Sequence, residues 1–218
     1  MLVLASASPR RAALLRTAGF EFVVCPVNVD ESARPGESAA AYVRRLAMEK
    51  SACAQDLVRQ QAAVSGSGLA GPTTESPVIV GADTAVVLGG AILGKPRDNA
   101  DAKAMLRQLS GRRHEVMTGV SVRRGEIERG RVEVTGVYFA TLSDTDVSSY
   151  VASGEGADKA GGYAIQGLAA RFISGIEGSY SNVVGLPVAC VVELLKELGC
   201  IPLPVGLSCR DGCSQKSL

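Results

Sequence analysis

The sequence predicts an α/β protein with a mixed sheet, and three observations lead to this prediction. Short apolar runs, at residues 2–5 and 78–82, are typical of buried strands. Amphipathic stretches of helical length alternate with such runs along the chain. A Gly-Gly pair between two further apolar runs indicates a β-hairpin, which adds antiparallel strands. At 218 residues, the chain is long enough for one sizeable core or for two lobes that share a sheet.

The first part of the chain is expected to hold two strands and two helices. After a strand over residues 2–5, Ser8 and Pro9 provide a hydroxyl N-cap and a proline at the first helical position, where the missing N–H costs nothing. A strand over 20–24, a loop that carries Glu31 and a helix over 38–61 follow. The Gly-, Ser- and Pro-rich segment 62–76 is expected to be a surface loop.

The second part opens with the hairpin VIVGADTAVVLGGAILGKP. Helices are expected over 100–109, 143–152 and 187–198, and a strand over 172–176. Two strands over 114–122 and 132–141 pair across the segment RRGEIERGR, which is expected to be their turn. Residues 1–200 therefore form a single domain, and residues 201–218, which lack periodicity, are expected to be a loosely structured tail.

Composition argues against several classes of protein. A net charge of +1 and only nine aromatic residues, none of them Trp, argue against a nucleic-acid binder. No apolar run has the length of a membrane span, and the N-terminus has no basic region typical of a signal peptide. The six cysteines form no CxxC pair, and His114 is the only histidine, so a zinc site is not expected. Scattered cysteines of this kind favour reduced thiols and a cytoplasmic location.

Asp83, in the motif GADT, is a candidate catalytic residue. The sequence places it at the C-terminal end of a central strand, where α/β sheets bind ligands. A carboxylate there can coordinate a divalent cation or accept a proton from water, although a turn-forming Asp is an equally good interpretation of the motif alone. The following GGAILGK matches part of a phosphate-binding loop, but Pro96 stands where that motif requires Ser or Thr. The hairpin instead brings Lys95 back beside Asp83.

The positive charges of Arg10 and Arg11 stand at a position where a helix favours negative charge. They lie in the first turn of a helix, whose N-terminus carries partial positive charge and favours anions. Either they point into solvent, or they bind an anion that is not part of the chain. With Lys50, Lys95 and Lys159 as further cations, and Glu31, Asp83 and Asp158 as carboxylates, the chain has the residues for binding a polyphosphate with a divalent metal. Taken singly, Glu31 and Lys50 are typical of surface positions, and His114 of a packed residue near a strand start.

Eight blocks in order give the chain a resemblance to the Maf family of nucleoside triphosphate pyrophosphatases. They are LASASPRR, VDE, LAMEKSA, VIVGADT, LGKP, LSGRRHEVMTGV, DKAGGYAIQG and SNVVGLP, spread between Leu2 and Gly199. The resemblance implies an elongated fold with a central cleft, similar to the inosine triphosphate pyrophosphatases. It also implies hydrolysis of nucleoside triphosphates to monophosphate and pyrophosphate. The segment 62–76 is longer than expected for the family, and the tail is unmatched.

The resemblance also implies roles for single residues. Asp83 would accept a proton from the attacking water, with Lys50 and Lys95 as further catalytic residues that hold the triphosphate. Ser8, Arg10, Arg11, Thr84, Lys159 and Gln166 would bind substrate. Glu31, together with Asp83, would bind a divalent metal, Mg²⁺ or Mn²⁺.

Three of these positions point to a substrate. Arg10, Thr84 and Gln166 are as in the branch of the family that acts on dTTP and UTP, a house-cleaning activity that extends to modified pyrimidine nucleotides. The branch acting on 7-methyl-GTP has an aromatic residue at position 10 and GSDQ in place of GADT. That activity, and a non-catalytic nucleotide-binding regulator of cell division, are the alternatives. The sequence leaves open whether the chain forms a homodimer.

Overall fold

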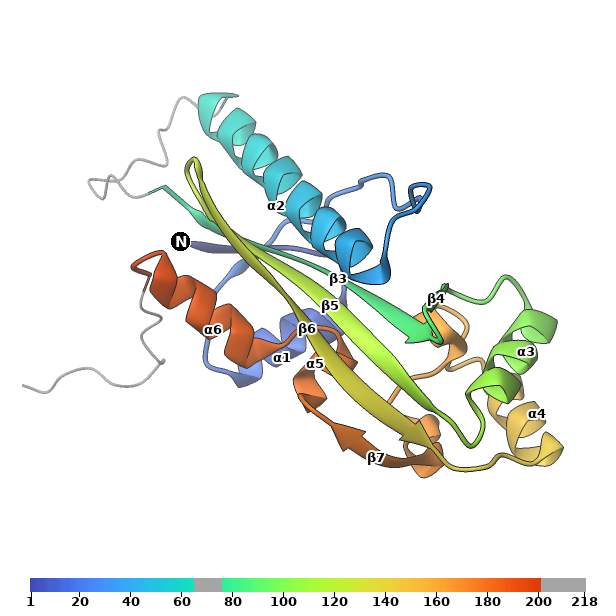
Figure 1. The fold of residues 1–218 in the computed structure, drawn as a ribbon. Helices are drawn as coiled ribbons and strands as arrows, with labels where there is room; N and C mark the ends of the chain where they lie inside the picture. Colours follow the sequence, from blue (N-terminus) through green and yellow to red (C-terminus); the bar gives the residue numbers. More distant parts are fainter. Residues whose placement is uncertain (65–75, 201–218) are drawn as a thin grey trace, which may run out of the picture.

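The structure, a computed structural model, describes residues 1–64 and 76–200 of the chain. Strands and helices alternate along it (Figure 1). In chain order they are β1 (Leu2–Ala5), α1 (Pro9–Thr17), β2 (Val23–Val24), α2 (Ala39–Val64), β3 (Val78–Leu88), β4 (Ala91–Leu93), α3 (Asn99–Leu109), β5 (Arg113–Arg124), β6 (Ile127–Phe139), α4 (Asp144–Ala152), the 3-10 helices η1 (Ala160–Gly162) and η2 (Leu168–Phe172), β7 (Ile173–Glu177), α5 (Tyr180–Val184) and α6 (Val188–Glu197).

The strands form one sheet in the order β2-β1-β3-β5-β6-β7, and β4 pairs with β3. β1 is parallel to β2 and β3, whereas β3, β5, β6 and β7 are antiparallel to their neighbours. The predicted α/β class with a mixed sheet is confirmed. β3, β5 and β6 have 11, 12 and 13 residues and run along the long axis of the molecule, which gives it an elongated shape (Figure 1).

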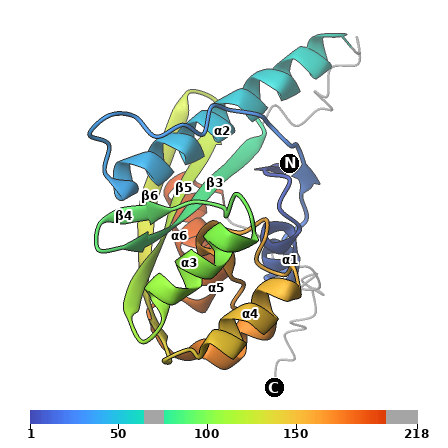
Figure 2. The same cartoon turned by 90° about the vertical axis from the view of Figure 1, so that its right-hand side faces the viewer.

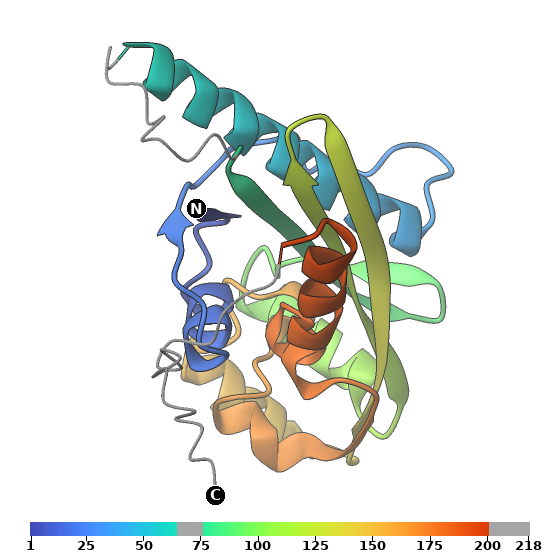
Figure 3. The same cartoon turned by 90° about the vertical axis from the view of Figure 1, so that its left-hand side faces the viewer.

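Helices cover both faces of the sheet. α2 lies across one face, and α1, α5 and α6 lie on the other (Figures 1 and 3). Two glycines allow α2 to approach closely: a Cβ on Gly81 of β3 would stand 2.3 Å from the carbonyl oxygen of Ala47, and one on Gly119 of β5 would stand 2.2 Å from that of Val43. Side chains at these two positions would push α2 away from the sheet. Gly81 and Gly119 therefore set the distance between α2 and the sheet, and with it the position of the side chains on α2.

Two apolar cores follow one another along the face of the sheet opposite α2. Val80 of β3 belongs to the first, which includes residues of α1 and α6, and Val86 belongs to the second, which includes residues of α3 and α4. Between them, Thr84 of β3 is in register with Thr118 of β5, and their hydroxyl oxygens are 2.9 Å apart. This polar pair of threonines therefore separates the two cores. Figure 2 shows α3 and α4 together at their end of the molecule.

The ribbon formed by β5 and β6 is longer than predicted. The sequence places the segment RRGEIERGR in a turn, whereas only Gly125 and Glu126 separate the two strands. The charged residues remain in extended strands because helices on both faces provide ionic partners. Arg44 of α2 contacts Glu128 at 2.8 Å, and Arg131 contacts two glutamates of α6.

Other elements agree with the prediction to within a few residues, except that β2 has two residues and that η1, η2 and α5 were not predicted. α2 continues to Val64 and so includes the start of the predicted surface loop. Most of that loop (65–75) and the predicted tail (201–218) lie outside the described residues. No helix in the described part of the chain is both long enough and apolar enough to cross a membrane.

Candidate functional site

One edge of β3 is open at its centre. On that edge, β1 pairs with residues 78–81 and β4 with residues 86–88, so residues 82–85 face no described strand there. The prediction that Asp83 ends a strand is wrong, because the apolar residues that follow it continue β3 to Leu88. Asp83 nevertheless lies just beyond Ala5, the last residue of the parallel strand β1. A gap at the carboxyl end of a parallel strand is a common place for a ligand.

A cleft of about 630 Å³ opens at this gap. Its walls come from the β1–α1 connection, the loop before α2, the end of β4 and the segment around η1. This volume lies within the usual range of small-molecule sites. All the residues predicted for the site line it: Ser8, Arg10, Arg11, Glu31, Lys50, Asp83, Thr84, Lys95, Lys159 and Gln166.

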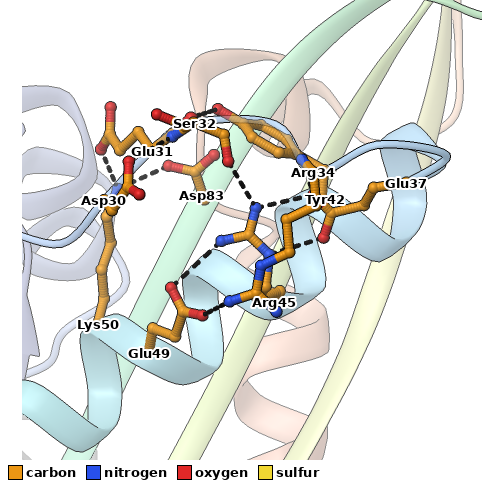
Figure 4. A network of polar contacts seen from close by, with 10 residues as sticks. All are labelled: Asp30, Glu31, Ser32, Arg34, Glu37, Tyr42, Arg45, Glu49, Lys50 and Asp83. Carbon is orange, nitrogen blue, oxygen red and sulfur yellow. Dashed lines mark hydrogen bonds and ion pairs between the residues drawn. The ribbon is translucent and has the colours of Figure 1, made fainter.

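Lys50 joins the two carboxylates of the site. It reaches from α2 toward Glu31 and Asp83 (Figure 4), and its Nζ donates to Glu31 Oε1 and to Asp83 Oδ1, both at 2.7 Å. Lys50 and Asp83 are each only 8% exposed, whereas Glu31 is exposed at the surface of the cleft. Partial burial works against ionisation of Glu31, but the hydrogen bond and charge of Lys50, with weaker effects of Lys95 and Arg11, lower the pKa of its carboxyl. Glu31 is therefore negatively charged at neutral pH.

Arg11 is fixed by three neighbours on the other side of the gap. Its Nε donates to the carbonyl oxygen of Gly185 at 2.7 Å, its Nη1 to Ser6 Oγ at 3.2 Å and its Nη2 to Thr84 Oγ1 at 3.0 Å. Burial lowers the pKa of the guanidinium, and the charge of Asp83 opposes this effect. A guanidinium remains charged in any case. The Thr84 hydroxyl contacts both Arg11 and Thr118, and Thr84 also lines the cleft.

The neighbouring Arg10 acts electrostatically on Asp158, in another part of the cleft. The pKa of the Asp158 carboxyl is lowered first by a hydrogen bond from Lys159 and, more weakly, by the charge of Arg10. Lys159 also donates to the carbonyl oxygen of Glu155 at 2.6 Å. Within residues 1–64 and 76–200, no protein partner is seen for the side chains of Arg10, Lys95 or Gln166. These three side chains are therefore available to a ligand.

The segment that carries Gln166 is held by Glu155. The Glu155 carboxylate accepts hydrogen bonds from Tyr150 Oη at 3.0 Å and from the amide of Leu168 at 2.8 Å. A Cβ on Gly167 would stand 2.2 Å from that carboxylate, so a side chain at position 167 would displace the Glu155 carboxylate from its present position.

Glu31 and Asp83 are the residues that could hold a metal ion. No group of three or more His, Cys, Asp and Glu side chains suited to a metal is found in the described part of the chain. However, both carboxylates direct an oxygen at the single cationic atom Lys50 Nζ. Two such oxygens fit Mg²⁺ or Mn²⁺, which commonly take one or two carboxylates and complete their shell with substrate phosphates and water. The residues present therefore fit a metal that arrives together with a polyphosphate.

Several residues of the site were not predicted. Ser6 and Gly185 hold Arg11, and Tyr42 donates from its Oη to the carbonyl oxygen of Glu31 at 2.9 Å. The buried Asn182 fastens α5 to the sheet, donating from Nδ2 to Val116 O at 3.0 Å and to a threonine of β6. Ser6, Asn182 and Gly185 lie in the blocks LASASPRR and SNVVGLP, and the match of these blocks to the family is the signal that could have identified them. Tyr42 lies in no quoted block.

Comparison with known proteins gives a consistent result. A family model described as Maf-like protein matches residues 1–198. A dTTP/UTP pyrophosphatase from Anaeromyxobacter sp. (strain Fw109-5) is 49% identical over 93% of this chain and 91% of its own. One from Hahella chejuensis is 48% identical over 91% and 92%, and one from Vibrio cholerae is 47% identical over 89% and 96%. The solved structure of the Staphylococcus aureus Ham1 protein is a distant match, with a TM-score of 0.37 and 12% identity over 64% of this chain and 71% of that one. The chain belongs to the Maf family.

Proposed function

We propose that this protein hydrolyses pyrimidine nucleoside triphosphates, dTTP and UTP, to the monophosphate and pyrophosphate. The observation that supports this most is the meeting of opposite charges in one cleft. The Glu31–Lys50–Asp83 group shares it with Arg10 and Arg11 at the N-terminus of α1 and with Lys95 after β4. The first group suits metal-assisted attack on phosphorus, and the second suits a triphosphate. The names of the similar proteins support the choice of substrate.

The mechanism assigns Asp83 to proton transfer. Its carboxylate accepts a proton from a water molecule, whose oxygen forms a bond to the α-phosphorus. The bond between that phosphorus and the bridging oxygen to the β-phosphate breaks, and pyrophosphate leaves. When bound at Glu31 and Asp83, a divalent metal would supply charge neutralisation for the phosphate oxygens. Lys50 would then exchange a carboxylate for a phosphate oxygen.

The cationic residues hold the leaving group. Arg11 is already fixed by Ser6, Thr84 and Gly185, so it loses little freedom when it binds phosphate. Arg10 and Lys95 add mobile positive charge that offsets the charge developing on pyrophosphate. The exposed Gln166, on the segment clamped by Glu155, is assigned to the pyrimidine, because an amide can both donate to and accept from the edge of the base.

The metal preference and the location belong to the same proposal. Oxygen ligands alone favour Mg²⁺ or Mn²⁺ over softer metals. Cys25, Cys53, Cys190 and Cys200 are free thiols, which suits a reducing compartment, and we place the protein in the cytoplasm.

A panel of nucleotides tests this function. The purified protein is incubated with Mg²⁺ or Mn²⁺ and dTTP, UTP, CTP, GTP, dATP or 7-methyl-GTP, and pyrophosphate and phosphate are assayed separately. Release of pyrophosphate from dTTP and UTP is expected. Activity confined to 7-methyl-GTP would contradict the roles of Arg10, Thr84 and Gln166 in pyrimidine preference. Binding without turnover of any nucleotide would favour a regulator.

A further inference from the structure

The loop that carries Glu31 has few backbone contacts of its own. Between Cys25 and Ser38, it forms no helix or strand, and its one internal backbone hydrogen bond runs from the Glu37 amide to the Arg34 carbonyl oxygen. Contacts of this kind do not determine where Glu31 lies. The position of the loop must therefore come from side chains, and those side chains belong to α2 (Figure 4).

Arg45 makes most of these contacts. Its Nε and Nη2 bind the two oxygens of Glu37 at 2.7 and 2.8 Å, and Nη2 also donates to the carbonyl oxygen of Ser32 at 3.1 Å. The guanidinium lies 5.6 Å from the centre of the Tyr42 ring. Ser32 directly follows Glu31, so Arg45 holds both the residue after the metal ligand and the end of its loop.

The Arg45–Glu37 pair is well shielded, since both side chains are only 9% exposed. Hydrogen bonding to Arg45, partly opposed by desolvation, lowers the pKa of Glu37 to about 2. A two-point contact between a guanidinium and a carboxylate fixes direction as well as distance. This pair is therefore rigid at any pH at which the enzyme is expected to work.

Tyr42 completes the arrangement. Burial, with the nearby charges of Asp83 and Glu31, raises the pKa of its hydroxyl to about 12, so the hydroxyl keeps its proton and donates to the carbonyl oxygen of Glu31. Tyr42 and Arg45 are three residues apart and are neighbours on the surface of α2, and Lys50 lies further along the same helix. α2 thus holds the two carbonyl groups that follow the Glu31 side chain, those of Glu31 and Ser32, and also supplies the lysine between Glu31 and Asp83.

We infer that Arg45, paired with Glu37, is a positioning residue that holds the Glu31 carboxylate beside Asp83 for the divalent metal. This inference rests on the proposed function. Loss of a group that orients a metal ligand commonly weakens metal binding by about 10- to 100-fold. Removing Arg45 should therefore raise the concentration of divalent metal needed for activity. Nucleotide binding through Arg10, Arg11 and Lys95 should stay in place.

The test compares Arg45→Met and Glu37→Gln with Arg44→Met. Arg44 is the next residue of α2 and makes its own ion pair, with Glu128, on the sheet side of the helix. It is a control for the loss of one guanidinium and of an ion pair with a glutamate, and Glu37→Gln leaves the further ion pair of Arg45, with Glu49, in place. For Arg45→Met and Glu37→Gln, we expect the Mg²⁺ concentration for half-maximal activity to rise about tenfold or more, with less than a twofold change in the KM for dTTP at saturating Mg²⁺. Arg44→Met should leave both values unchanged.

Two further measurements do not depend on turnover. Mn²⁺ binding in the presence of a non-hydrolysable dTTP analogue, followed by electron paramagnetic resonance, should weaken by a similar factor in Arg45→Met. Amide hydrogen exchange of residues 28–36 in the nucleotide-free protein should be faster in Arg45→Met than in the wild type or Arg44→Met. An unchanged Mg²⁺ requirement, or an equal shift in Arg44→Met, would overturn the inference. If the wild type released no pyrophosphate, the proposed function would fail, and hydrogen exchange would still decide whether Arg45 positions the loop.

Discussion

At the scale of single residues, the cleft is organised by pairing charges before any ligand binds. Lys50 contacts Glu31 and Asp83 at 2.7 Å each, so the two buried groups, Lys50 and Asp83, are paired with each other, and the exposed Glu31 also contacts Lys50. An unpaired buried charge is costly, and this pairing avoids that cost. Asp83 also lines the cleft beside the stretch of β3 that pairs with neither β1 nor β4, where a water bound in the cleft can reach a proton acceptor.

Replacing Asp83 by Asn tests the proton transfer. The amide has nearly the same shape but cannot accept the proton of water, and we expect kcat for dTTP to fall by about 10²- to 10⁴-fold. Circular dichroism and binding of a non-hydrolysable analogue would establish that the variant is folded and still binds nucleotide. Turnover close to that of the wild type in such a folded variant would rule out the assigned role.

The sequence predicted which residues belong to the site better than what they touch. Lys50, typical of a surface position when considered alone, is buried because two carboxylates from distant segments surround it. Thr84, predicted to bind substrate, lines the cleft, and the sequence did not indicate that its hydroxyl also contacts Arg11 and Thr118. These contacts join residues 19 to 73 positions apart and depend on the packing of elements, which motif spacing does not record.

At the scale of elements, the distance between α2 and the sheet decides whether Lys50 reaches Asp83. Gly81 and Gly119 set that distance, because a Cβ on either would meet the backbone of α2. Gly81 lies two residues before Asp83 on the same face of β3 and is in direct contact with the turn of α2 that precedes Lys50.

Gly81→Ala should therefore lower both stability and activity. The added methyl group forces α2 outward, and we expect a loss of about 1–3 kcal/mol in the free energy of unfolding, together with a fall in kcat. Gly94→Ala is the control for stability, since a Cβ there meets nothing within 4 Å and should change the free energy of unfolding by less than about 0.5 kcal/mol. Urea denaturation measures both. Equal stabilities for the two variants would contradict the role given to Gly81.

Element prediction was weakest where local pattern and tertiary contacts disagree. The charged ribbon around Gly125 was expected to be a loop, but ion pairs to α2 and α6 keep it in strands. The helix α5 has only five residues, too few for a periodic pattern, and is fixed by Asn182 instead. The long strand, hairpin and helix boundaries elsewhere follow from apolar runs, caps and glycines, which are local signals.

At the scale of the whole molecule, two apolar cores lie on the face of the sheet opposite α2 and are separated by the polar pair Thr84 and Thr118. The second core contains His114, whose Nε2 lies 2.7 Å from Tyr163 Oη and whose ring packs edge-on against Phe139. Burial, with a smaller effect of Arg113, lowers the pKa of His114 to about 4. His114 is thus neutral in the folded protein and takes part in packing.

This burial makes stability depend on pH. Between pH 6.5 and about 4, the unfolded chain binds a proton at His114 that the folded protein does not, so the free energy of unfolding falls as the pH is lowered. One proton corresponds to about 1.4 kcal/mol per pH unit at most. His114→Phe should remove most of this slope between pH 5 and 6.5, whereas Tyr163→Phe, which keeps the histidine, should retain it. Urea denaturation at several pH values checks this, and an unchanged slope in His114→Phe would contradict it.

The most direct test of the central claim, attack of water on the α-phosphorus, is to hydrolyse dTTP in water enriched in oxygen-18 and to locate the label by mass spectrometry. We expect one labelled oxygen in dTMP and none in pyrophosphate, because the bond between the α-phosphorus and the bridging oxygen is the one that breaks. Label in pyrophosphate, or release of single phosphate with dTDP, would contradict the mechanism assigned to Asp83 and its neighbours.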